Sequence, residues 1–123
     1  LTIPVFARAT GFRPGPALFL ETTGRKSGIT RGVALPYFEY DDEIMVVGSN
    51  GGAPRDTNWV LNLRTTPEAV AYIKRKRRSV HARFTDGEER DRYWKLLKER
   101  VPAYHEYEQL TTREIPVVVL ESR

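Results

Sequence analysis

The sequence contains no cysteine, and this absence excludes several classes of site. A chain without thiols cannot form disulfides, a cysteine-ligated zinc site, an iron–sulfur cluster or a cysteine nucleophile. Histidine is scarce as well: His81 and His105 are the two histidines, and neither has a partner at metal-ligand spacing. We therefore expect no metal site, and the lack of cysteine favours a cytoplasmic protein.

Long apolar runs and the common catalytic motifs are also missing. The run Val117–Leu120 is four residues long, whereas a membrane-spanning helix needs about 20. The N-terminus lacks the basic-then-apolar pattern of a signal peptide. Neither G-x-S-x-G nor G-x-G-x-x-G occurs, and Gly24–Ser27 matches only the end of a P-loop. Hydrolase and P-loop NTPase chemistry are therefore not expected.

The composition is that of one globular domain. The chain has 123 residues, of which 40% are hydrophobic and 29% charged, a profile that can bury a core without staples. Breakers such as Pro14 and Pro16 predict a loose N-terminal arm over residues 1–16, followed by a single domain over 17–123. The net charge of +4 favours an anionic partner: nucleic acid, acidic lipid or a phosphorylated small molecule.

The order of the expected elements indicates an α+β fold built on an antiparallel sheet. Strand patterns occur at 17–22, 30–40, 43–48, 69–73, 79–84 and 115–121, and helix patterns at 58–64, 85–100 and 102–107. Thr85 and Glu88 predict a capping box for the second helix. Hairpin connections argue against alternating βαβ units. We therefore predict a six-stranded antiparallel split β-barrel with flanking helices.

The segment Thr22–Gly28, with Arg31 just beyond it, combines two glycines with hydroxyls and three cations. Glycine lets backbone N–H groups approach an anion, and Arg and Lys donate charge-assisted hydrogen bonds. This segment is a candidate cradle for a phosphate or carboxylate. An ordinary hairpin turn with solvated charges is the alternative.

A second candidate is the glycine-rich loop Gly48–Gly52, which leaves a central strand. Glycines there allow a flat ring to lie against the backbone. Asn58 and Asn62 share one helix face beside Trp59 and could form a ligand wall. The alternatives are a flexible loop and an aromatic that belongs to the core. The basic run Lys74–Arg78 either binds a polyanion or is a solvated hairpin tip. It lacks interleaved aromatics, so no specific nucleic acid is expected.

Four blocks, in order along the chain, together resemble the deazaflavin (F420)-dependent nitroreductase family. They are Leu20–Gly28, Ser49–Pro54, Asn58–Leu63 and Thr112–Leu120. The resemblance implies a split barrel of the FMN-binding type that binds coenzyme F420, a deazaflavin with a phosphodiester and an oligoglutamate tail. It also implies hydride transfer from reduced F420 to a small electrophilic acceptor such as a quinone, enone or nitro-compound.

The resemblance carries site roles onto matching positions. It implies four sets of cofactor-binding residues: those that bind the anionic tail, a segment that runs along the cofactor, residues beside the deazaflavin ring, and a helix that closes the site. In that order they are Arg25, Lys26, Ser27 and Arg31; Gly32, Val33, Ala34, Leu35 and Pro36; Val47, Gly48, Ser49 and Asn50; and Asn58, Trp59, Val60, Leu61 and Asn62. Ser49 is the catalytic candidate, because it can stabilise charge on the acceptor. Tyr104 and Tyr107 are expected to form the acceptor pocket.

The sequence also departs from the family's pattern. Pro36 and Val101 replace tyrosines that nitroreductase members often carry, and Asn50 replaces a lysine. Reduction of bulky nitroimidazoles is therefore not expected. Two alternatives remain: an FMN-binding split-barrel oxidoreductase, and a non-catalytic module that binds F420 or polyanions. The basic surface also allows weak association with an acidic membrane, which would place the protein peripherally.

Overall fold

The computed structural model describes residues 13–14 and 17–123. Its strands are β1 (Arg13–Pro14), β2 (Leu18–Thr23), β3 (Thr30–Leu35), β4 (Phe38–Tyr40), β5 (Glu43–Val47), β6 (Glu68–Ile73), β7 (Lys76–Phe84) and β8 (Val117–Ser122). Its helices are the short 3-10 turn η1 (Asn50–Gly52), α2 (Asn58–Thr65), α3 (Gly87–Arg100) and α4 (Ala103–Leu110). Of the arm expected over residues 1–16, residues 1–12 and 15–16 lie outside the described part.

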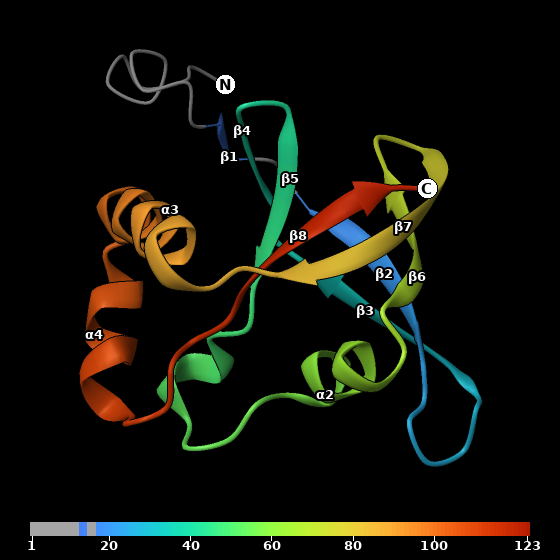
Figure 1. The fold of residues 1–123 in the computed structure, drawn as a ribbon, viewed down its shortest axis with the longest axis horizontal. Helices are drawn as coiled ribbons and strands as arrows, with labels where there is room; N and C mark the ends of the chain where they lie inside the picture. The colour runs from blue at the N-terminus through green and yellow to red at the C-terminus, as the bar shows by residue number, and fades with distance from the viewer. Residues whose placement is uncertain (1–12, 15–16) are drawn as a thin grey trace.

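The strands form one antiparallel sheet in the order β1-β4-β5-β8-β7-β6-β2-β3. The sheet curls into a half-barrel around α2, and α3 and α4 lie together on its other side (Figure 1). The α+β class and the antiparallel, hairpin-linked sheet are as predicted. The number of strands is not: eight strands pair where six were expected.

Pro36 explains one of the two additional strands. The expected strand over 30–40 is two strands, because proline has no N–H for a ladder and the chain leaves the sheet there. Before Pro36, β3 pairs with β2 at one end of the sheet, and after it β4 pairs with β5 near the other end. Tyr37, between them, is fully buried. The chain thus crosses the open side of the half-barrel, and the two-residue β1 adds the eighth strand by pairing with β4.

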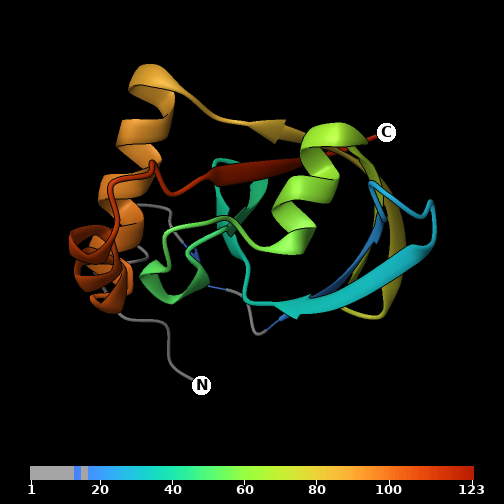
Figure 2. The same ribbon diagram turned by 90° about the horizontal axis from the view of Figure 1, so that it is seen from below.

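Two hydrophobic clusters hold the layers together. On the concave side, α2 packs Val60 and Leu63 against sheet residues such as Leu20 and Val46. On the convex side, α3 and α4 cover β5 and β8, as Figure 2 shows from below. The buried residues of that cluster are Phe38, Met45, Tyr93, Trp94, Leu97, Tyr104, Ile115, Val117 and Val119. Burial of both faces explains why residues 44–47 of β5 and 117–120 of β8 are apolar.

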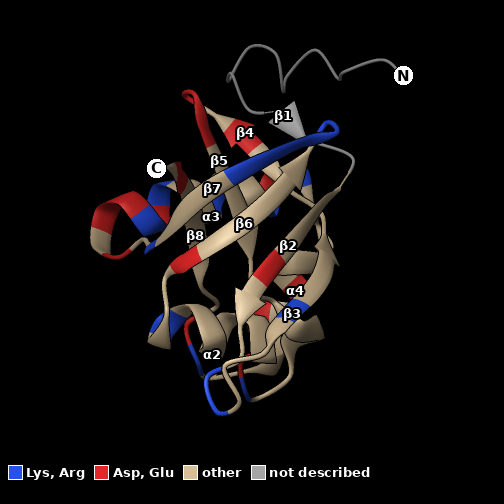
Figure 3. Cartoon of the chain, turned by 90° about the vertical axis from the view of Figure 1, so that its right-hand side faces the viewer, with Lys and Arg blue, Asp and Glu red and all other residues tan. Residues whose placement is uncertain are grey.

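The basic run forms less of a loop than expected. Only Lys74 and Arg75 make the turn, with φ of +52° and +67°, and Lys76–Arg78 already belong to β7. Figure 3 shows this basic hairpin at the opposite end of the barrel from the turn that follows β2. A ligand bound at the turn after β2 would therefore lie away from the basic hairpin.

The capping box predicted at Thr85 does not form. Helix α3 begins at Gly87, with Asp86 as the N-cap. The Thr85 hydroxyl donates instead to the carbonyl of Val117 at 2.8 Å. Thr85 therefore ties β7 to β8 rather than capping α3. Among the described residues, no helix is both long enough and apolar enough to cross a membrane.

Candidate functional site

A cavity of about 920 Å³ lies between the turn after β2, strand β3, the loop after β5, helix α2 and Tyr104 of α4. This volume is at the upper end of typical small-molecule sites. The predicted site residues that line it are Arg25, Lys26, Ser27, Arg31, Gly32, Val33, Leu35, Pro36, Val47, Gly48, Ser49, Asn50, Asn58, Trp59, Asn62 and Tyr104. Segments far apart in the sequence thus meet in one site.

Four predicted residues do not line the cavity. Ala34 is directly opposite Phe19 of β2, and alternation along β3 turns it to the outer face. Val60 is fully buried in the core, and Leu61 follows it on α2. Tyr107 packs against Tyr104, with ring centroids 6.2 Å apart. Four further lining residues were not among those predicted: Thr22, Gly24, Gly51 and Thr57.

One end of the cavity is positively charged, and hydrogen bonds hold the side chain of Arg25 in place there. The Arg25 backbone N–H and Nη1 donate to Oδ1 of Asn62 at 3.1 Å and 3.0 Å, and Nη2 donates to Oδ1 of Asn58 at 3.3 Å. Asn62 is itself buried and donates from Nδ2 to Oγ1 of Thr22 at 3.1 Å. Because every one of these partners is neutral, Arg25 is held in place with its charge uncompensated.

Lys26 and Arg31 add two more positive charges at this end. Both are exposed, and neither side chain forms an ion pair or hydrogen bond with any residue that the structure describes. Lys26 lies in the turn after β2 and Arg31 near the start of β3; the turn is closed by Gly24 N–H donating to the Ile29 carbonyl and Gly28 N–H donating to the Gly24 carbonyl, both at 2.8 Å. Three cations therefore face the same space, which is the electrostatic environment that a multiply charged anion needs.

The other end of the cavity is largely apolar. Its walls include Val33, Leu35 and Pro36 on one side and Trp59 on another. Gly48 forms part of it: its N–H donates to the carbonyl of Pro116 at 3.0 Å. A Cβ at Gly48 would lie 2.7 Å from Cγ2 of Val60, so any other residue there would require its neighbours to shift. This end suits a flat ring system.

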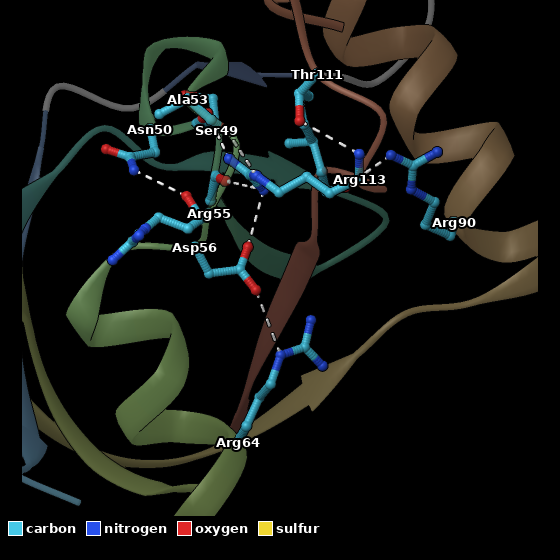
Figure 4. Close-up of polar contacts among 11 residues, drawn as sticks. Ser49, Asn50, Ala53, Arg55, Asp56, Arg64, Arg90, Thr111 and Arg113 are labelled. Atoms are coloured by element: carbon cyan, nitrogen blue, oxygen red, sulfur yellow. Dashed lines mark hydrogen bonds and ion pairs between the residues drawn. The ribbon is translucent and has the colours of Figure 1, made fainter.

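Arg113 fixes the loop that follows β5 (Figure 4). Its guanidinium donates to the carbonyls of Ala53, Gly48 and Ser49 at 2.9, 3.2 and 2.8 Å, and to Oδ1 of Asp56 at 2.8 Å. Arg113 belongs to a block that carried the family resemblance, but its role could not be read from the sequence. The contact spans sixty positions of the chain to Ala53.

Tyr104 closes the cavity from α4. Its ring stacks on Trp94 at 5.7 Å and meets the edge of Phe38 at 6.3 Å. Burial raises the pKa of Tyr104 to about 12, so its hydroxyl stays protonated at neutral pH. Tyr104 can therefore donate a hydrogen bond but is not poised to release a proton.

Ser49 also lines the cavity, and its hydroxyl makes no hydrogen bond within the described part of the chain. Across residues 13–14 and 17–123 there is no group of three or more potential metal ligands. The arrangement combines an anion-binding end with a ring-binding end and a few neutral donors. It can hold and orient a large anionic cofactor, whose own chemistry would then do the work.

Comparisons with known proteins point to one family. Residues 7–122 match the family model described as F420H(2)-dependent quinone reductase. An F420H(2)-dependent quinone reductase of Mycobacterium tuberculosis is 36% identical over 111 residues, covering 88% of this chain and 74% of the relative. A second protein of that organism, a putative F420H(2)-dependent quinone reductase, is 33% identical over 114 residues, covering 92% and 96%.

Solved structures extend the likeness to the fold. The F420-H2 dependent reductase FDR-A has a TM-score of 0.76 and 37% identity, with 86% of this chain and 94% of that chain covered. HutZ of Vibrio cholerae, described as a heme storage protein, has a TM-score of 0.64 at 13% identity, covering 96% and 85%, which shows a shared split-barrel fold alone. With its cationic, glycine-lined cavity and these matches, the chain belongs to the F420H(2)-dependent quinone reductase family.

Proposed function

We propose that this oxidoreductase transfers a hydride from reduced F420 to a quinone bound in the same cavity. The observation that carries the proposal is the continuity of the cavity, which joins uncompensated cations at one end to an apolar, glycine-lined space at the other. When bound, reduced F420 supplies the hydride. Residues of this chain position both reactants and exclude water.

The residues present fit this coenzyme at both ends. F420 carries a phosphodiester and an oligoglutamate tail, and Arg25, Lys26 and Arg31 provide cations without acidic partners among the described residues. Val47–Asn50 and Trp59 would hold the ring. FMN has one phosphate and no glutamates, so this set of cations would exceed what FMN needs.

Quinones are the proposed acceptors, with enones and small nitro-compounds as further substrates. Tyr104 would border the acceptor as a neutral donor, with Tyr107 supporting its ring from behind. The Ser49 hydroxyl would stabilise the oxygen that gains charge. Pro36 and Asn50 shape the cavity where nitroreductase members often carry larger side chains, and we therefore propose slow turnover of bulky nitroimidazoles.

A titration of the purified protein with F420, and with FMN in parallel at fixed low salt, tests the proposal. We expect micromolar or tighter binding of F420 and far weaker binding of FMN. Oxidation of reduced F420 by 1,4-naphthoquinone then tests turnover. Preference for FMN, or binding of F420 without turnover of any quinone, would contradict the proposal.

A further inference from the structure

Arg113 orients two backbone N–H groups toward the cavity. Peptide bonds in the described residues are trans, so each carbonyl points opposite to the N–H of the next residue. The Arg113 guanidinium holds the carbonyls of Gly48 and Ser49. The N–H groups of Ser49 and Asn50 therefore point away from Arg113. That is the side of the cavity, which Gly48, Ser49 and Asn50 line and Arg113 does not.

The backbone angles give these N–H groups a concave arrangement. Ser49 is right-handed, with φ of −68° and ψ of −35°, whereas Asn50 and Gly51 have φ of +46° and +61°. A right-handed residue followed by a left-handed one forms a nest, in which successive N–H groups converge on an anion. Neither the Ser49 nor the Asn50 N–H donates to any residue in the described ranges. Both donors are available to a ligand.

The turn is held by more than Arg113. Gly52 N–H donates to the Ser49 carbonyl at 2.9 Å, and Asn50 Nδ2 donates to the Arg55 carbonyl at 2.9 Å. Arg113 itself is 14% exposed and paired with Asp56, so its charge is largely matched. The Ser49 and Asn50 N–H groups therefore present two oriented peptide dipoles to the cavity, and these dipoles need not reorganise when charge develops.

We propose that the Ser49 and Asn50 N–H groups form an oxyanion hole for the acceptor, with Arg113 as the positioning residue. This inference rests on the proposed quinone reduction. A quinone that takes up a hydride gains two electrons and one proton, and its second oxygen is an anion until a proton from water completes the hydroquinone. The nest would bind that oxygen anion and so lower the barrier to the transfer.

Ser49 offers an experiment that separates its N–H from its hydroxyl. Ser49→Ala removes the hydroxyl alone, and Ser49→Pro also removes the N–H. The Ser49 φ of −68° suits proline, and the preceding Gly48 has no Cβ to clash with the ring. We expect Ser49→Pro to lower kcat for 1,4-naphthoquinone at least tenfold more than Ser49→Ala, since loss of one such donor costs about 10²–10³. Because Ser49 also borders the expected ring site, kcat is compared at saturating F420 for each variant.

A binding measurement provides a readout other than turnover. 2-Hydroxy-1,4-naphthoquinone is an anion at neutral pH and mimics the charged oxygen, whereas 1,4-naphthoquinone is neutral. With oxidised F420 bound, Ser49→Pro should weaken binding of the anion at least tenfold more than binding of the neutral quinone. In wild type, the amide resonances of Ser49 and Asn50 should shift on adding the anion.

Arg113→Lys tests the positioning role and serves if Ser49→Pro does not fold. A single ammonium keeps the ion pair with Asp56 but cannot span three carbonyls. We expect the same selective loss of kcat and of anion binding. Arg55→Ala is the control, because the Arg55 side chain lies in the same loop without a hydrogen bond to any described residue.

The outcomes separate this inference from the proposed function. Failure of wild type to bind F420 or to reduce the quinone would refute both. Normal wild-type turnover with equal losses in Ser49→Ala and Ser49→Pro would assign the role to the hydroxyl and overturn the oxyanion hole. Equal weakening of the anionic and neutral quinones in Arg113→Lys would overturn the positioning role of Arg113.

Discussion

Arg25 and Asn62 lie against each other although 37 positions separate them, and one side-chain oxygen of Asn62 accepts both the backbone N–H and the guanidinium of Arg25. A carboxylate there would bind Arg25 more tightly. The amide instead fixes the turn and leaves the cation free to attract a ligand.

Asn62→Asp tests this arrangement with almost no change in shape. The new carboxylate would neutralise Arg25 and lose the donor that pairs with Thr22. We expect F420 affinity to fall roughly tenfold, since one charge-assisted contact is worth about 1.5–3 kcal/mol. Fluorescence titration measures the affinity. Asn62→Leu is the comparison: it removes the hydrogen bonds without adding charge, and an equal loss in both variants would show that geometry rather than charge matters.

Lys26→Ala should weaken F420 binding by about ten- to a hundredfold, because the variant removes an exposed cation from the tail-binding end. The loss should shrink as salt is raised, since screening reduces the contribution of an exposed charge. The matched control is Lys76→Ala, which removes one exposed lysine from the basic hairpin at the opposite end of the barrel. If both variants bind F420 as wild type does, Lys26 has no role in holding the tail.

The sequence predicted the parts of the fold that depend on neighbours in the chain. The expected strands 30–40 and 43–48 leave Asp41 and Asp42 between them, and both residues have the positive φ that a tight hairpin turn needs. The break at Pro36 was not predicted, because residues 30–40 were expected to form one strand. Whether a proline bends a strand or ends it depends on which strands lie beside it, and β3 and β4 pair with partners at opposite ends of the sheet.

The candidate site was predicted from blocks of residues rather than from contacts. The resemblance that those blocks carry named most of the residues that line the cavity, including Arg25 within a block and Tyr104 outside all four. Arg113 was missed, because its importance lies in reaching three carbonyls of a distant loop, and a carbonyl has no signature in the sequence. Ala34 was included because it lies between lining residues, although the alternation of a strand turns it outward.

Gly48→Ala should destabilise the fold without any change in backbone conformation. The added Cβ would lie 2.7 Å from Cγ2 of Val60 and 2.8 Å from Cγ of Pro116. Overpacking of this kind costs about 1–3 kcal/mol, which lowers Tm by several degrees. The double variant with Val60→Ala provides the control. Because it removes one of the clashing groups, Gly48→Ala should cost less in that background, and strictly additive effects would argue against the clash.

Glu108 joins α4 to α3 and predicts a dependence of stability on pH. Its carboxylate accepts hydrogen bonds from Nε1 of Trp94 and, at 3.0 Å, from Nζ of Lys98. The hydrogen bond from Trp94, followed by that from Lys98, lowers the pKa of Glu108 below its ordinary value of 4.5. A group whose pKa is lowered by folding stabilises the fold above the unfolded pKa, and that contribution is lost as the pH falls through the folded value.

Glu108→Gln removes the titrating group and tests the sign of this effect. Thermal unfolding from pH 7 down to pH 3 should show wild type more stable than the variant at neutral pH, with the difference shrinking below about pH 4.5. The difference should be modest, because the Glu108 side chain is 37% exposed and therefore partly screened. Glu99→Gln on α3 is the control, since Glu99 is exposed and forms no ion pair within the described residues. A gap between wild type and Glu108→Gln that stays constant over the whole range would mean that Glu108 acts by packing rather than by charge.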